Sequence, residues 1–181
     1  LVAKMTEQFF KDVIWGELDF LILDLPPGTG DVQLTLSQKI PLDGAIIVTT
    51  PNDIALTDVR KGADMFNKVK TPLLGVVENM SYMEIAGKLK TSSIKPSDIE
   101  LQLDSKVIPL NEDFSFKHKF HLFKQGGGLN ESKRLDIPLL AEIPYSEDLM
   151  LSIDKGEPLV FADENHPISE IFTQIANSLK D

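Results

Sequence analysis

The sequence predicts an α/β protein in which a parallel sheet carries helices on both faces. Four short apolar runs, each bounded by turn residues, are typical of buried strands in such a sheet; they lie near residues 20–24, 44–49, 73–78 and 139–143. The segments between them carry apolar residues at helical spacing. This alternation of strand and helix predicts parallel pairing with right-handed crossovers.

Helical spacing of apolar residues is the evidence for each helix. Near the C-terminus, Ile168, Ile171 and Ile175 form one stripe. After the fourth apolar run, Ser146 is a good helix-capping residue. The spacing predicts helices over residues 2–14, 31–38, 55–69, 130–135, 146–154 and 168–179.

The pattern changes after Tyr82. Residues 87–98 are rich in lysine, serine and threonine, so we expect an exposed loop there. Apolar and polar residues then alternate within 99–123, which predicts an antiparallel β-hairpin excursion from the sheet, with residues 111–113 in its turn. We expect one domain over 1–181, with residues 84–123 as an insertion in it.

Composition limits the class of protein. The length of 181 residues suits one domain with a sizeable core, and a net charge of −10 argues against a general nucleic-acid surface. No apolar run approaches the ~20 residues of a membrane span, and no signal peptide is visible, so we expect a cytoplasmic protein. With no cysteine, the chain has no disulfide and no thiolate metal ligand.

The stretch from Leu18 to Gln33 carries the first functional signal. An apolar run ends on Asp24, and a loop containing Gly28 and Gly30 follows. A carboxylate at a strand end can hold Mg²⁺ or its water, and a loop amide can sense a γ-phosphate. These residues alone fit an ordinary turn after a buried strand equally well.

A longer set of motifs resembles a known family. The segment Asp24–Asp31 resembles the Walker B and switch II region of the Mrp/NBP35 family, which are MinD/ParA-type P-loop ATPases of the SIMIBI class that carry iron–sulfur clusters. Other segments resemble that family in the same order, and the resemblance covers nearly the whole chain outside residues 84–120. These segments are Trp15-Gly16-Glu17, Thr49-Thr50-Pro51, Val77-Glu78-Asn79-Met80-Ser81-Tyr82 and Gly126-Gly127-Gly128.

The resemblance implies a site for ATP and Mg²⁺. Asp24 would help to position the metal ion indirectly, and Gly28 beside Pro27 would sense the γ-phosphate. Both Asp24 and Gly28 would therefore serve ATP hydrolysis in an intact protein. The G-x-x-x-x-G-K-[ST] phosphate loop is absent from this sequence, so we expect it to precede Leu1 and expect this chain alone to be inactive.

The resemblance also implies a base-binding side. Asn79 would hydrogen-bond adenine, and the loop with Pro144 and Tyr145 would close over the base. From the residues alone, Asn79 fits equally well as a strand-end asparagine bonded to its own turn.

The iron–sulfur function is where the sequence departs from the family. Many members place a Cys-x-x-Cys pair between the Asn-Met-Ser-Tyr segment and the triple glycine, and here that interval has no cysteine, which puts a cluster in doubt. His118 and His121 have an odd separation, which in a strand directs them to opposite faces, so we do not expect them to share a metal ion.

By the resemblance, the partners are a second copy, in a homodimer, and client apo-proteins. Asp58, Arg60 and Lys61 open a helix that flanks the dimer face in the family, but they fit a solvated face as well. Two other functions stay open. One is a non-catalytic scaffold or interaction module, and the other is a ParA-like positioning ATPase with no cluster role.

Overall fold

The computed structural model describes residues 8, 10, 12–25, 31–91, 94–103 and 105–180. The chain forms two compact units: unit 1 is Leu1–Glu78 with Gly127–Ala141, and unit 2 is Asn79–Gly126 with Glu142–Asp181. Strands β2 (Leu73–Lys88) and β6 (Leu139–Tyr145) each run through both units. Because two strands are shared in this way, we keep the single-domain organisation as a prediction.

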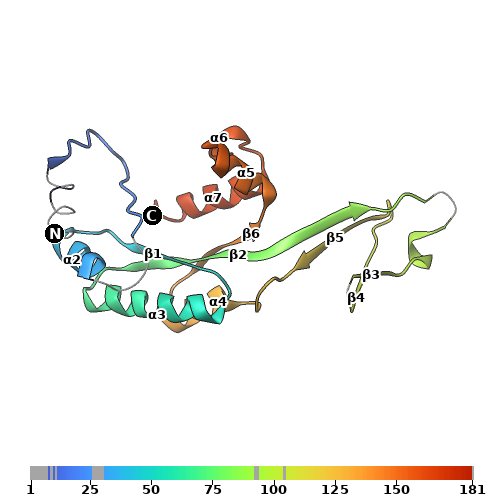
Figure 1. The fold of residues 1–181 in the computed structure, drawn as a ribbon, viewed down its shortest axis with the longest axis horizontal. Coiled ribbons are helices and arrows are strands. Elements are labelled where there is room, and N and C mark those ends of the chain that lie inside the picture. Colours follow the sequence, from blue (N-terminus) through green and yellow to red (C-terminus); the bar gives the residue numbers. More distant parts are fainter. Residues whose placement is uncertain are drawn as a thin grey trace. The chain divides into compact units, whose positions relative to one another are not determined.

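Unit 1 contains the predicted parallel sheet. Strand β1 (Ala45–Thr49) pairs in parallel with the first part of β2, and Thr49 lies opposite Glu78 at the end of the ladder. Strand β6 also pairs with β2, and the Val76 amide donates to the Pro138 carbonyl at 2.9 Å. The predicted α/β class with a parallel sheet is therefore confirmed (Figure 1).

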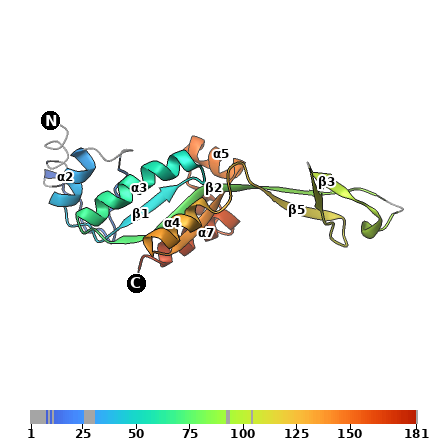
Figure 2. The same cartoon turned by 90° about the horizontal axis from the view of Figure 1, so that it is seen from below.

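Helices α2 (Asp31–Lys39), α3 (Asp53–Lys68) and α4 (Gly127–Leu135) belong to unit 1. Helix α3 begins after Asn52, whose side-chain oxygen accepts the Ile54 amide at 2.8 Å and so caps the helix. Helix α3 packs on β1, and Figure 2 shows α3 and α4 lying side by side. Their apolar faces enclose the core, which consists of Ile47, Ala63, Met65, Phe66 and Val76.

The predicted strand at residues 20–24 is wrong. The segment is irregular, and the side chains of Phe20 and Ile22 are 61% and 90% exposed. A strand forms only where a neighbouring strand supplies the ladder hydrogen bonds, and within the described ranges no strand pairs with this segment. Only Leu25, at its end, packs against the core of unit 1. The predicted helix over 2–14 lies largely outside the described residues.

Unit 2 contains an antiparallel hairpin, but its pairing differs from the prediction. Strand β2 continues to Lys88 and pairs with β5 (Ser115–Phe120), with Met83 opposite Phe120. Strands β3 (Leu101–Leu103) and β4 (Lys106–Ile108) pair separately as a small two-stranded sheet. The predicted hairpin strand at 99–104 is therefore not the partner of β5, and the first two residues of the predicted loop, Gly87 and Lys88, belong to β2 instead.

Cross-strand contacts explain the observed pairing. The Lys117 ammonium lies 2.9 Å from the Glu84 carboxylate across the ladder. A Cβ at Gly87 would lie only 2.8 Å from the ring of Phe116, so the glycine makes room for that ring. The ion pair and the packing of an aromatic ring over a glycine stabilise this register. Neither contact can be predicted from one segment alone, because each joins residues of two strands.

The C-terminal part of unit 2 is helical. Helix α5 (Glu147–Lys155) begins after Ser146, whose hydroxyl accepts the Leu149 amide at 3.2 Å, as the capping pattern predicted. Helix α7 (Pro167–Asn177) confirms the predicted C-terminal helix. Helix α6 (Leu159–Ala162) and the 3₁₀ turn at Pro96–Asp98 are too short to give a periodic signal. Among the described residues, no helix is long and apolar enough to cross a membrane.

Candidate functional site

The carboxyl end of β1, where its parallel ladder with β2 ends at Glu78, forms a polar edge of unit 1. Thr49 is buried, and its hydroxyl donates to the Thr50 carbonyl at 3.0 Å. Pro51 is almost fully buried in the loop that follows β1. Ligands of open α/β sheets bind outside the carboxyl ends of parallel strands, so this edge is the first place to look for a site.

Glu78 is the central charged residue of this edge. Its side chain is 2% exposed, and its carboxylate accepts a hydrogen bond from the backbone amide of Gly128. Gly128 lies in the first turn of α4, where backbone amides have no partner within the helix. A carboxylate is stabilised there by the free amides and by the helix dipole.

Glycine is required at two positions of the triple-glycine motif. A Cβ at Gly127 would lie 2.9 Å from the Cα of Pro51, and one at Gly128 would lie 2.8 Å from the Cβ of Glu78. Real Cβ atoms essentially never approach so closely. The motif therefore lets the start of α4 pack directly against the loop after β1 and against β2 at Glu78.

A second buried carboxylate connects α4 to α3. The side chain of Glu131 is 1% exposed, and its two oxygens accept hydrogen bonds at 2.6 Å from Arg60 and from Arg134. Burial alone would raise the pKa of Glu131, but the two guanidinium groups outweigh it and hold that pKa below its ordinary value. The hydrogen bond and charge of Glu131 raise the pKa of Arg60 in turn.

Sequence reasoning missed both carboxylates and assigned Arg60 only to a helix face. One signal for Glu78 was present, because an acidic residue directly follows the buried run Leu73–Val77. Glu131 gave no such signal, since it lies in a short polar helix and its burial depends on contacts from α3.

Unit 2 contains the predicted base-side residues. Asn79 is half-buried, and its side-chain oxygen accepts the Met80 amide at 2.9 Å, as the turn-bonding alternative predicted. Met80 adopts a positive φ of 54°, which turns the strand locally. Pro144 and Tyr145 end β6, and Tyr145 is 43% exposed. Within the described part of unit 2, no hydrogen bond or ion pair joins Asn79 to either residue.

The structure describes one of the three residues predicted to lie on the phosphate side of the site. Asp24 is exposed in the irregular segment of unit 1, and Pro27 and Gly28 lie outside the described residues. Over the described ranges, no group of three or more histidine or acidic residues could hold a metal ion. His121 is instead engaged with the protein, since its Nδ1 lies 3.1 Å from the Ser81 carbonyl.

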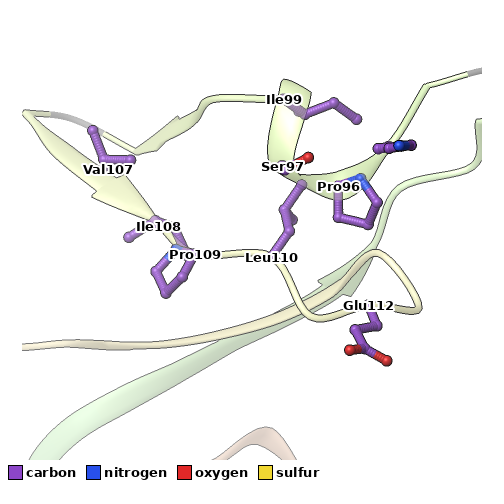
Figure 3. A pocket seen from close by; sticks show the side chains of 9 residues that line it. Pro96, Ser97, Ile99, Val107, Ile108, Pro109, Leu110 and Glu112 are labelled. Atoms are coloured by element: carbon purple, nitrogen blue, oxygen red, sulfur yellow. The ribbon is translucent and has the colours of Figure 1, made fainter.

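A hollow of about 550 Å³ lies in unit 2, beside the small sheet of β3 and β4. Figure 3 shows Pro96 and Ile99 across the hollow from Ile108 and Pro109. Its lining is mostly apolar, and it contains none of the predicted site residues.

These residues fit a nucleotide base better than a triphosphate. An asparagine held by its own oxygen presents its amide nitrogen as a donor, which suits a ring nitrogen of adenine. Phosphates need a cradle of free backbone amides and a lysine. The glycine-rich start of α4 does not supply that cradle, because the Glu78 carboxylate already occupies its Gly128 amide.

Two solved structures show which fold this is. The fold is that of the MinD cell-division ATPases: the structure from Pyrococcus furiosus matches with a TM-score of 0.56 at 17% identity, over 98% of this chain and 56% of that chain. The MinD protein of Aquifex aeolicus also matches with a TM-score of 0.56, at 19% identity, over 98% of this chain and 58% of that one.

The chain belongs to the ParA family of NUBPL-type iron-transfer P-loop NTPases, whose family model matches residues 1–106 and 111–180. A similar relative is an iron–sulfur cluster carrier protein of Pseudomonas fragi, 38% identical over 97% of this chain and 52% of its own length. The iron–sulfur cluster transfer protein NUBPL of Mus musculus is 36% identical over 99% of this chain and 47% of its own length.

A nucleotide-binding protein from Archaeoglobus fulgidus, solved in complex with ADP, matches with a TM-score of 0.60 at 33% identity. That match covers 86% of this chain and 53% of the solved chain. The present chain thus spans about half the length of the relatives that it matches. The family resemblance and the MinD-like fold expected from the sequence are both confirmed.

Proposed function

We propose that this chain forms the base-binding part of an ATP-binding protein of the iron–sulfur cluster carrier type. The observation that carries the proposal is the match to proteins named iron–sulfur cluster carriers, at 36–40% identity over 97–99% of this chain. A solved relative with bound ADP supports nucleotide binding.

On the base side, Asn79 hydrogen-bonds adenine, and Pro144 with Tyr145 closes over the ring. The bond between the Asn79 oxygen and the Met80 amide supports this role, because it fixes the orientation of the side-chain amide. The exposed ring of Tyr145 is available to stack on a base.

On the phosphate side, Asp24 would position Mg²⁺ through a bound water, and Gly28 with Pro27 would sense the γ-phosphate. Mg²⁺ would neutralise charge on the phosphates during hydrolysis. The described residues do not themselves cradle a triphosphate, so ATP hydrolysis is proposed only for a protein that also contains a phosphate loop. Such a protein would act as a homodimer in the cytoplasm and would transfer its cargo to client apo-proteins.

The cargo itself raises a second candidate function. Clusters are usually held by cysteine thiolates, and this chain has none. That observation favours a nucleotide-dependent scaffold or positioning ATPase of the same family that carries no cluster.

Reconstitution with iron and sulfide under anaerobic conditions separates the two candidates. We expect this chain to develop no cluster absorbance, while the iron–sulfur cluster carrier protein of Pseudomonas fragi, treated in parallel, does so. The absence of a cluster on this chain would support the second candidate function, in which the residues of this chain hold no cluster. A stoichiometric cluster on this chain would establish the carrier function and would require oxygen or nitrogen ligands.

A further inference from the structure

Over the described residues, one edge of strand β5 has no strand partner; β4 contacts β5 but pairs with β3 instead. In the described part of the chain β5 is the last strand of its sheet, and β2 is the strand that pairs with it. The Leu89 amide donates to the Phe114 carbonyl at 3.1 Å, which fixes the phase of the antiparallel ladder. Because hydrogen-bonded pairs alternate along such a ladder, the backbone groups of Lys117 and Lys119 face away from β2.

This edge is basic in an acidic protein. The chain has a net charge of −10, yet no aspartate or glutamate lies between Ser115 and Gln125. The same segment contains three lysines and two histidines, namely Lys117, Lys119, Lys124, His118 and His121. A partner strand beside β5 therefore meets positive charge at the two positions whose backbone groups it would bond.

The two edge lysines are held in place. The Lys117 ammonium lies 2.9 Å from the Glu84 carboxylate, and the Lys119 ammonium lies 3.9 Å from the centre of the Tyr82 ring. Both contacts involve residues of β2, so the lysine stems lie along the sheet. Ordered side chains lose less conformational entropy when a partner binds.

We propose that the open edge of β5 binds an extended acidic segment of a partner protein, which adds to the sheet as a further strand. Backbone hydrogen bonds to Lys117 and Lys119 supply the affinity, and the excess of lysine and histidine over acidic residues between Ser115 and Gln125 favours an acidic partner. The partially exposed ring of Phe120 offers an apolar contact on the other face of the strand. This surface shares no residue with the proposed nucleotide site.

Two other occupants fit less well. Edge-to-edge pairing with a second copy of β5 would bring lysines against lysines, which is how natural edge strands resist self-association. A nucleic acid draws its affinity from several cations that are available to phosphates. Here Lys117 already pairs with Glu84 and Lys119 with Tyr82, so strand addition, which relies on backbone groups, is favoured.

The test uses the whole 181-residue chain and a labelled peptide in which glutamate alternates with valine. We expect binding by fluorescence anisotropy that weakens as salt is raised, together with slowed amide exchange at Lys117 and Lys119. The same peptide with N-methylated backbone amides should lose at least about tenfold in affinity, because it cannot complete the ladder. Equal binding of the methylated peptide would overturn strand addition.

Charge-reversal variants test the location. Lys117→Glu with Lys119→Glu should weaken peptide binding by about tenfold or more. The matched control, Lys90→Glu with Lys106→Glu, makes the same change in net charge outside β5 and should bind as the wild type does. The proposal fails if both double variants lose affinity equally. It also fails if the chain binds an oligothymidine more tightly than the acidic peptide.

Discussion

The buried carboxylate of Glu78 accepts a hydrogen bond from the backbone amide of Gly128, which joins strand β2, at the end of its parallel ladder with β1, to the start of helix α4. The glycine is required there because a Cβ would collide with Glu78 itself. The triple glycine is therefore a packing device that lets α4 approach the sheet, and the electropositive start of the helix is already occupied by a carboxylate.

Gly128→Ala should destabilise the protein. The added methyl would lie 2.8 Å from the Glu78 Cβ, so either the helix or the strand end must move, at a cost of roughly 1–3 kcal/mol in the free energy of unfolding. Denaturant titration measures this. The control is Gly62→Ala in α3, where nothing lies within 4 Å of the new Cβ. That change should stabilise by about 0.5–1 kcal/mol, and equal losses for both variants would contradict the packing role.

Glu78→Ala should lower the free energy of unfolding by about 1–3 kcal/mol, because it removes the acceptor of a buried amide. Glu78→Gln retains an oxygen at nearly the same position and should recover much of that loss. Hydrogen exchange at the Gly128 amide reports the bond directly: it should be fast in the alanine variant and slow in the glutamine variant. Slow exchange in both would show that another group protects the amide.

Glu131 should make stability depend on pH in the acid range. Its pKa is lowered in the folded protein relative to the ordinary 4.5, so its contribution is fully present above about pH 4.5 and is lost as pH falls through the folded pKa. The free energy of unfolding of the wild type should therefore fall more steeply with acid than that of Glu131→Gln. Parallel pH profiles for the two proteins would contradict the ion pairs with Arg60 and Arg134.

The turn before β5 offers a local test. Hydrogen bonds from the Ser115 hydroxyl, then from Lys88, then from the Ser115 amide hold the pKa of Asp113 far below its ordinary value. Ser115→Ala should raise that pKa in an NMR titration, because it removes the largest of these contributions. Lys88→Met should raise it less. A larger rise in the Asp113 pKa for Lys88→Met than for Ser115→Ala would show that the ion pair with Lys88 makes the main contribution.

The local spacing of apolar and capping residues correctly predicted those helices and strands whose structure is determined by their own sequence. Apolar spacing located α3 and α7, and a capping serine located α5 within one residue. Beta-branched and apolar content located β1, whose residues Ile47 and Thr49 are buried.

The sequence-based predictions failed for segments whose structure depends on which strand they pair with. Residues 20–24 have the composition of a buried strand, but the described chain gives them no ladder. Strand β2 runs past Val77 to Lys88 because β5 pairs with its second half. The alternation of apolar and polar residues in that half is short and interrupted by a glycine, so it does not indicate the longer strand. In the candidate site, the role of Asn79 stays a prediction from motif resemblance. The contacts of Glu78 with Gly128 and of Glu131 with Arg60 depend on packing between distant segments, which the sequence pattern does not reveal.

The central claim is that Asn79 lies on the base side of an ATP site whose phosphate cradle the described residues do not supply. Calorimetric titration with Mg-ATP tests it on this chain alone and on the chain extended at its N-terminus by a segment with a G-x-x-x-x-G-K-[ST] phosphate loop. We predict no binding on the order of micromolar by the chain alone, binding by the extended protein, and a loss of about tenfold or more with Asn79→Ala. Micromolar ATP binding by the chain alone, or an unchanged affinity in the Asn79→Ala protein, would contradict the claim.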